Sequence, residues 1–227
     1  MNTIDKDINC PVCNGKTKRL FNSVQQCSEC RHVVDYTSAP DSQGYCDEKL
    51  AGTCDYRPTN ENDVERMKKR WELVLHHASG AKSLLDYGCA NNFFIESAPQ
   101  DHGFDELVGF DTNWLTGKSD ERKLDRYYDV ITMWHSMEHL IRPRMVVDRV
   151  PHRYLFLIIP WVENMTMENI ATTNIFNIGR HLHLYSRKSL FSVLHDYEIL
   201  EENYEDSQLF NEGENNIVGF ALKRRIR

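Results

Sequence analysis

Short apolar runs that each end in polar residues dominate the middle of the chain. They cover residues 83–87, 108–110, 128–134 and 153–160. Apolar runs of this length suit parallel strands that are covered on both faces of a sheet. The pattern therefore predicts an α/β fold with a mostly parallel sheet, whose ligand lies outside the carboxyl ends of the strands.

Two helices are predicted beside these strands. Asn62 and Asp63 are expected to cap a helix that runs to about Ala78, because apolar residues repeat on one face and a glycine follows. Ser186 is the expected N-cap of a second helix that runs to His195. Both patterns indicate helices that pack one apolar stripe against the sheet.

The end of the chain predicts two more strands, near residues 197–204 and 216–223. The connection between them, residues 205–215, is polar and poor in helical periodicity, so we expect an antiparallel hairpin. Earlier in the chain only residues 112–128 separate two strands, and a crossover helix alone takes about 10 to 12 residues. Either a third strand is vestigial there or its helix is lost.

The residues after the first two strands predict a nucleoside site. Gly88 allows the backbone to approach a ligand closely, and Asp111 can accept hydrogen bonds from both hydroxyls of a ribose. The turn reads Gly-Cys-Ala-Asn-Asn and lacks the later glycines of a dinucleotide fingerprint, which disfavours NAD. Cys89 is expected to be a small packing residue in this turn.

These motifs, in this order, resemble the class I S-adenosylmethionine-dependent methyltransferases over roughly residues 80 to 200. The segment Trp134–Leu140 is similar to the branch of that family in which W-H-x-x-E-H-L follows the fourth strand. The resemblance implies a Rossmann-like fold and S-adenosylmethionine as cofactor. It implies cofactor contacts from Asp86, Gly88, Cys89, Ala90, Asp111, Thr112, Trp134 and His135. It leaves the usual adenine-contacting carboxylate without a certain counterpart, with Asp120, Glu121 and Asp125 as candidates.

Four of the seven cysteines have the spacing of a metal site. Cys10 with Cys13, and Cys27 with Cys30, form two C-x2-C knuckles. Four thiolates in two knuckles suit a structural zinc ion, and redox thiols are the alternative. We expect a zinc ribbon over residues 1–36, a linker or active-site lid over 37–62, and a methyltransferase domain over 63–227. In the linker, Cys46 and Cys54 are interpreted as free thiols in preference to a second metal site. Tyr45 and Tyr56 either line a substrate pocket or are exposed in the loop.

Histidines and a glutamate form a candidate catalytic cluster. His135, Glu138 and His139 would share one face of a helical turn after the fourth strand, and His181 leads a segment similar to the H-L-x-x-F-T of the family. In one reading, His181 or His139 is a general base that Glu138 orients. In another, implied by the resemblance to related methyltransferases in which an E-x-x-E-H segment and a later histidine bind a divalent ion, these four residues hold a second divalent ion. His135 replaces the first glutamate of that segment, which favours an ion softer than Mg²⁺ or no ion. In a third, Glu138 and His139 only cap and pack the turn.

Charge and composition limit the classes of molecule that the protein is expected to bind. The net charge of −7 disfavours a broad nucleic-acid-binding face. No apolar run approaches ~20 residues and the first residues lack a signal-peptide pattern, so we expect a cytoplasmic protein outside the membrane. The expected acceptor is the O, N or C nucleophile of a small molecule, with sugars and glycan precursors suggested by similar ribbon-bearing bacterial methyltransferases. A non-catalytic binding module and a ribbon-guided nucleic-acid methyltransferase are the alternatives.

Overall fold

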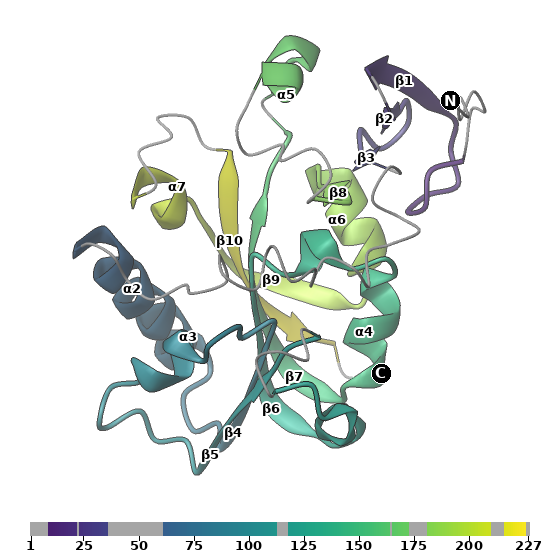
Figure 1. Cartoon of the computed structure of the whole chain (residues 1–227). Helices are drawn as coiled ribbons and strands as arrows, with labels where there is room; N and C mark the ends of the chain where they lie inside the picture. Colours follow the sequence, from purple (N-terminus) through teal and green to yellow (C-terminus); the bar gives the residue numbers. More distant parts are fainter. Residues whose placement is uncertain are drawn as a thin grey trace.

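The computed structural model of the chain describes residues 9–21, 23–35, 61–112, 118–163, 165–172, 181–209 and 216–225 (Figure 1). Within these ranges the strands form two sheets, one of six strands and one of four. Residues 37–60 of the predicted linker lie outside the described residues. The predictions for Cys46, Cys54, Tyr45 and Tyr56 concern this part of the chain. Residues 61 and 62 belong to the first described helix.

The six-stranded sheet confirms the mixed α/β fold that the sequence predicts. Its strands lie in the order β5 (Glu106–Phe110), β4 (Ser83–Tyr87), β6 (Tyr128–Trp134), β7 (His152–Pro160), β10 (Ile217–Arg224) and β9 (Tyr197–Asn203). The first four strands pair in parallel, whereas β10 is antiparallel to both β7 and β9. The carboxyl ends of β4, β5, β6 and β7 therefore share one edge, where ligands of such sheets bind.

Both faces of this sheet are buried, which explains why its strands read as continuous apolar runs. Along β6, Val130 and Trp134 belong to one hydrophobic cluster, and Ile131 and Met133 belong to the other. The first cluster contains residues of α2 (Glu61–His77) and α3 (Phe93–Glu96), and the second contains residues of α4 (Pro143–Arg149) and α6 (Arg187–Val193). Figure 1 shows these helices on opposite sides of the sheet. Each large apolar side chain buried in this way contributes about 1.5–3 kcal/mol.

The helix boundaries agree closely with the sequence pattern. Helix α2 begins at Glu61, just before the predicted caps, and ends at His77. Helix α6 has Ser186 as its N-cap, and the Oγ of Ser186 accepts a hydrogen bond from the backbone nitrogen of Ser189 at 3.2 Å. That bond satisfies one of the amide groups left without a partner at a helix start.

The C-terminal hairpin is confirmed, but its connection differs from the prediction. It contains a short helix, α7 (Glu205–Leu209), that apolar periodicity does not indicate. Asp206 and Ser207 of α7 are buried, and Asp206 pairs with Arg70 of α2. Tertiary contact rather than intrinsic propensity therefore holds this five-residue helix, because so short a helix is unstable in isolation.

The third strand of the usual sheet is missing from the described part of the chain. Between β5 and β6, residues 111–112 and 118–127 contain one 3₁₀ turn, η3 (Glu121–Asp125), and no strand. Strand β5 consequently forms the edge of the sheet. The described residues between β5 and β6 contain neither a strand nor an α-helix, so in this part of the chain both elements named in the two alternatives are absent.

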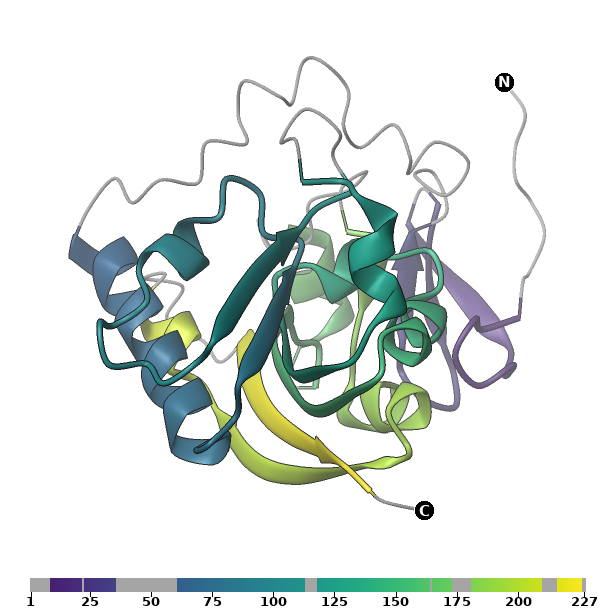
Figure 2. The same ribbon diagram turned by 90° about the horizontal axis from the view of Figure 1, so that it is seen from below.

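The cysteine-rich segment forms the second sheet together with β8 (His183–Leu184), a strand about 150 residues later in the sequence. Strands β1 (Thr17–Phe21), β2 (Val24–Cys27) and β3 (Val33–Asp35) are antiparallel, and β3 pairs with β8. Figure 2 shows the ribbon, in purple, on the side of the sheet opposite α2. The ribbon is therefore joined to the rest of the protein through backbone hydrogen bonds.

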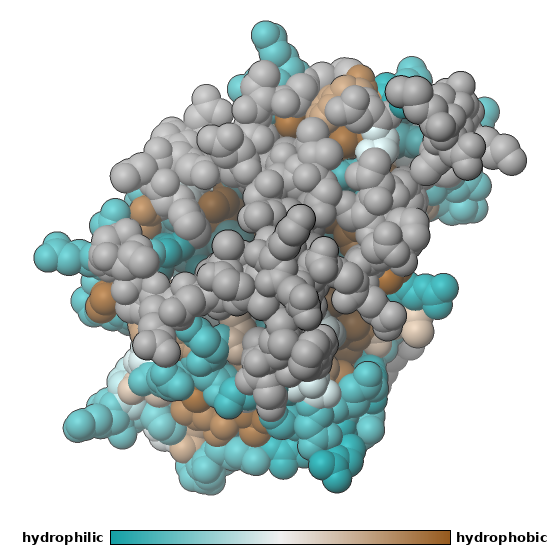
Figure 3. Space-filling view, viewed as in Figure 1, coloured by the Kyte–Doolittle hydropathy of each residue, from teal (hydrophilic) through white to brown (hydrophobic). Residues whose placement is uncertain are grey.

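Hydrophilic residues cover much of the described surface in Figure 3, with smaller apolar patches between them. Short helices, including α5 (Met167–Thr172), connect the strands. Within the ranges that the structure describes, no helix is both long enough and apolar enough to cross a bilayer.

Candidate functional site

The turn after β4 has a backbone that lies partly in the left-handed region. The φ angles are +83° at Gly88, +44° at Ala90 and +71° at Asn92. The backbone nitrogens of Gly88 and Cys89 donate hydrogen bonds to the carbonyl of Phe110 at 2.8 and 3.1 Å. A side chain at Gly88 would overlap the hydroxyl of Ser136, so glycine is required for this close approach.

Asp111 at the end of β5 supports the same turn. Its Oδ2 accepts a hydrogen bond from the backbone nitrogen of Ala90 at 2.8 Å. Ala90 and Asn92 keep a glycine-like backbone without being glycine, which costs roughly 1–2 kcal/mol per residue. The carboxylate of Asp111 offsets part of that cost, and Thr112 follows it as an exposed residue. Asp111, the residue predicted to bind the ribose, is thus in direct contact with the predicted turn.

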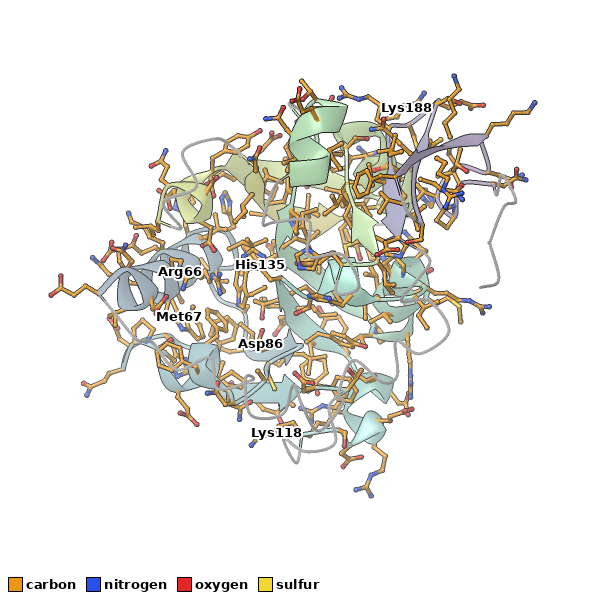
Figure 4. All side chains as sticks on the ribbon, turned by 45° about the horizontal axis from the view of Figure 1, so that its top comes forward. Arg66, Met67, Asp86, Lys118, His135 and Lys188 are labelled. Carbon is orange, nitrogen blue, oxygen red and sulfur yellow. The ribbon has the colours of Figure 1, made fainter. Side chains whose placement is uncertain are left out.

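Asp86 and Trp134 lie at the neighbouring strand ends. Asp86 is buried, and its Oδ1 accepts a hydrogen bond from Thr132 Oγ1 at 2.7 Å. Burial raises the pKa of Asp86 to about 7. The buried Nε1 of Trp134 finds no hydrogen-bond acceptor among the described residues. Figure 4 shows Asp86 and His135 near the centre of the molecule, with Arg66 and Met67 of α2 to their left and the loop residue Lys118 below Asp86.

These features fit the bound nucleoside that the sequence predicts. A carboxylate stands at the end of β5, and a glycine turn at the end of β4 presents backbone to the same edge. The indole nitrogen of Trp134 and the carboxyl of Asp86 add polar atoms at that edge. The three carboxylates considered as adenine contacts are instead engaged in ion pairs at the surface. Asp120 pairs with Arg122, and Glu121 and Asp125 pair with Arg149, all as surface charges.

Glu138, His139 and His181 form a compact cluster beside this edge. Each offers one ligand atom, and the three atoms lie within 4.8 Å of one another. The rings of His139 and His181 are 4.8 Å apart between centroids. Glu138 is fully buried, and neither of its carboxylate oxygens has a hydrogen-bond donor among the described residues. Burial acts to raise the pKa of Glu138, but His135, His139 and His181 outweigh it and lower that pKa.

His135 departs from the predicted arrangement. The 3₁₀ turn η4 covers only Met137–His139, and His135 precedes it with a φ of +51°. Its Nδ1 lies 3.5 Å from Glu138 Oε1, but its Nε2 faces Asp206 Oδ2, also at 3.5 Å. The residues therefore do not share one helical face, because the chain turns sharply after β6. His135 therefore lies between the Glu138 cluster and α7.

Arg70 and Asp206 belong to the site although sequence reasoning missed them. Arg70 Nη2 lies 2.6 Å from Asp206 Oδ2, and the guanidinium lies 5.3 Å from the ring centre of Trp134. Arg70 falls on the apolar stripe of α2 between Met67 and Val74, a position where a charged residue signals a buried partner. Asp206 lies in a polar connection and carries no such signal.

The four ribbon cysteines converge as their spacing predicts. The Sγ distances are 3.7 Å for Cys10 to Cys30, 3.4 Å for Cys13 to Cys27 and 3.4 Å for Cys13 to Cys30. A tetrahedral zinc site with Zn–S bonds of about 2.3 Å needs sulfur atoms about 3.8 Å apart. Backbone nitrogens of Val12 and Glu29 donate to the sulfurs of Cys10 and Cys27. The donor set therefore fits a structural zinc ion.

A family model described as a methyltransferase domain matches residues 60–198, which is more than half of the chain. The match spans α2, the parallel strands and the Glu138 cluster. No curated protein matches the chain.

Several solved structures share the fold. The plantazolicin methyltransferase BpumL in complex with SAH has a TM-score of 0.52 at 11% identity, covering 82% of this chain and 94% of that chain. A complex between the Haloferax volcanii Trm112 methyltransferase activator and the putative methyltransferase has a TM-score of 0.51 at 8% identity, covering 80% and 98%. The [4+2]-cyclase SpnF has a TM-score of 0.52 at 8% identity, covering 84% and 96%. At such identities the likeness concerns the fold alone, as the cyclase illustrates.

Proposed function

The chain belongs to the methyltransferase domain family, and from this premise we propose that it transfers a methyl group from S-adenosylmethionine to a nucleophile of a small molecule. The observation that carries the proposal is that Asp111 and the Glu138 cluster flank one sheet edge, formed by the ends of β4, β5 and β6. One part of that edge suits a nucleoside, and the other suits an acceptor whose proton must be removed.

The cofactor side of the edge is assigned to five residues. Asp111 is proposed to accept the ribose hydroxyls, while Gly88 and Ala90 present the backbone of the turn. Asp86 and Trp134 would contact the methionine part, with the buried Nε1 of Trp134 available as a donor. The cofactor supplies an electrophilic methyl group on a sulfonium. The protein's task is then to align a nucleophile with that methyl group and exclude water.

On the acceptor side we assign general-base catalysis to the histidines. A buried carboxylate is costly unless cationic or donor groups stand beside it, and the imidazoles of His135, His139 and His181 are the groups that lower the pKa of Glu138. When His181 or His139 takes a proton from the acceptor, Glu138 stabilises the imidazolium produced. Glu138 also holds the backbone of the second histidine segment, because its carbonyl accepts from the nitrogen of Leu182 at 3.0 Å.

A divalent ion at the same cluster is the second candidate, and the spacing of the three ligand atoms favours it specifically. Two imidazoles and one carboxylate suit Mn²⁺, Fe²⁺ or Zn²⁺ better than Mg²⁺. His135 faces Asp206, so the proposed ligand set has three residues rather than the four expected from the sequence. Such an ion would orient an acceptor with adjacent oxygens.

The ribbon is proposed to hold one structural zinc ion through Cys10, Cys13, Cys27 and Cys30. A reducing compartment such as the cytoplasm would preserve these thiols. The net charge of −7 supports a small-molecule acceptor over a nucleic acid. Sugars and glycan precursors are the first acceptor class to test.

The experiment is a metabolite screen with methyl-labelled S-adenosylmethionine and zinc-loaded protein. We expect label in a small molecule, lost in Glu138→Gln and retained in Glu168→Gln, which changes an exposed glutamate of α5 as a control. Label recovered only in RNA or DNA would support the ribbon-guided alternative. Protein that binds neither S-adenosylmethionine nor S-adenosylhomocysteine would support a non-catalytic binding module.

A further inference from the structure

The ribbon is bound to the segment that carries His181. In the β3–β8 pair, Val33 lies opposite Leu184 and Val34 lies opposite His183. The backbone nitrogen of Asp35 also donates to the carbonyl of Leu182 at 3.1 Å. Residues 181–185 are therefore held by the ribbon along one side.

The other side of this segment is held by the candidate catalytic turn and by the residues that directly follow β7. Leu182 donates its backbone nitrogen to the carbonyl of Glu138 at 3.0 Å, and Val162 donates to the carbonyl of Tyr185 at 3.0 Å. The ring of His181 then meets that of His139. The segment is thus inserted between the ribbon and the Glu138 cluster, so a shift of β3 must move the acceptor side.

His32 is the side chain that spans this junction. Its Nε2 lies 3.0 Å from Nδ1 of His183, and its Nδ1 lies 3.3 Å from Oγ of Ser189. His32 and His183 are both buried. One histidine from the ribbon therefore connects the strand that follows His181 with the first turn of α6.

The second cysteine knuckle fixes the backbone of His32. The carbonyl of His32 accepts from the nitrogen of Cys27 at 2.8 Å, and Cys30 lies two residues earlier. The same knuckle is anchored to α6, because the hydroxyl of Ser186 donates to the carbonyl of Cys30. Lys188, labelled in Figure 4, donates to the carbonyl of Glu29 at 2.9 Å. Four thiolates on one ion would lock this knuckle and, with it, the position of His32.

We propose that His32 is a positioning residue for methyl transfer, through which the metal-loaded ribbon holds the His181 segment against Glu138. The inference rests on the proposed function and adds to it that the ribbon is part of the acceptor site. A ribbon that acted only as a separate folding unit would need neither the His32–His183 contact nor the β3–β8 pairing.

The test compares His32→Ala, His32→Gln and the control His195→Ala, which removes an exposed histidine. Zinc content, S-adenosylhomocysteine affinity, amide hydrogen exchange at 181–185 and steady-state kinetics are measured for each. In His32→Ala we expect zinc and cofactor affinity to be retained, exchange at 181–185 to rise, and kcat to fall by ~10–100-fold, because small misplacements near reacting groups are costly. His32→Gln, whose amide nitrogen reaches the position of Nε2, should recover much of both losses.

Wild-type exchange and kcat in a zinc-loaded His32→Ala would overturn the proposal, and so would a lower melting temperature with kcat unchanged. If His32→Ala fails to fold, wild-type protein with and without zinc gives the answer. Exchange that increases at 181–185 on zinc removal supports the coupling, and an increase confined to residues 9–35 contradicts it. The exchange measurement needs no acceptor, so a failure to find methyl transfer would count against the proposed function alone.

Discussion

Arg70 on α2 and Asp206 on α7 form a buried ion pair, with 2.6 Å between Nη2 and Oδ2 and side-chain exposures of 7% and 5%. It joins the helix that precedes the sheet to the connection of the C-terminal hairpin. His135 is a second partner of Asp206, with its Nε2 3.5 Å from Asp206 Oδ2. The strand ends, the N-terminal helix and the hairpin are therefore linked at the candidate site.

Asp206→Asn should destabilise the protein strongly. It leaves the guanidinium of Arg70 buried without its counter-charge, which typically costs about 3–5 kcal/mol. Urea unfolding followed by tryptophan fluorescence measures the change. Asp101→Asn, at an exposed position, is the control and should stay within about 0.5 kcal/mol of wild type. A loss below about 1 kcal/mol for Asp206→Asn would mean that Arg70 is solvated and the pair is not buried in solution.

His152 should make stability depend on pH. Burial lowers the pKa of His152 to about 4, with the carbonyl of Val150 opposing this effect in part and Arg224 adding to it. The neutral ring suits its contacts, because its two nitrogens lie 2.6 Å from the carbonyl of Val150 and 2.6 Å from the hydroxyl of Tyr197. The unfolded state, with a pKa near 6.5, binds a proton first as the pH falls. Stability is therefore lost between about pH 6.5 and pH 4.

Comparison of wild type with His152→Gln isolates this effect. Between about pH 7.5 and pH 5, wild type should lose about 2 kcal/mol more of its free energy of unfolding than the variant does. The exposed His195→Gln should keep the wild-type slope. Equal slopes for wild type and His152→Gln would show that His152 titrates normally in the folded protein.

From the four converging cysteines of the ribbon we expect one zinc ion per chain. Cys27→Ser should release it and loosen the ribbon while the six-stranded sheet stays folded, because so small a segment has little core of its own. Cys89→Ser, which changes a thiol of the cofactor turn, should retain zinc. Elemental analysis and hydrogen exchange provide the measurements. Freshly purified, reduced wild-type protein without zinc would remove the assignment.

Base catalysis and metal catalysis give opposite results at the Glu138 cluster. For a general base, His181→Ala should lower turnover by ~10²–10⁴ with cofactor affinity unchanged, and chelators that spare the ribbon should have no effect. For a metal site, mild chelation should abolish activity, and Mn²⁺, Fe²⁺ or Zn²⁺ should restore it. Activity that resists chelation and survives both His181→Ala and His139→Ala would leave the cluster with a structural role.

Local patterns were sufficient to predict much of this structure. Strands β4, β6 and β7 are recognisable in the sequence because both of their faces are buried, and the N-cap Ser186 is recognisable because a capping hydroxyl acts within its own turn. The four cysteines were recognised because coordination geometry dictates their spacing. In each case the physical constraint lies between residues close in sequence.

Contacts between distant segments were not predictable in the same way. Helix α7 is held by the contact of Asp206 with Arg70, 136 residues away, and its five residues are too few to show a helical apolar periodicity. The position of His135 between Glu138 and Asp206 likewise involves a partner 71 residues further along the chain. The pairing of β3 with β8 was not predictable either. The cysteine spacing indicates the ribbon, but β8 has only two residues, too few to show a strand pattern in the sequence.

The assignment of the cofactor edge is tested most directly by titrating S-adenosylhomocysteine into wild type, Asp111→Ala and Asp111→Asn. Hydrogen bonds to a charged partner are worth about 1.5–3 kcal/mol each, so the alanine variant should bind at least about tenfold more weakly. Asparagine can still accept from Ala90, so its smaller loss reports the ribose contact with the turn intact.

Asp105→Ala is the matched control, because Asp105 precedes β5 at its amino end whereas Asp111 follows the carboxyl end. We expect wild-type affinity for Asp105→Ala and the weakened binding for Asp111→Ala, with both variants folded. Wild-type affinity in a folded Asp111→Ala, or no binding by wild type itself, would contradict the placement of the cofactor at this edge.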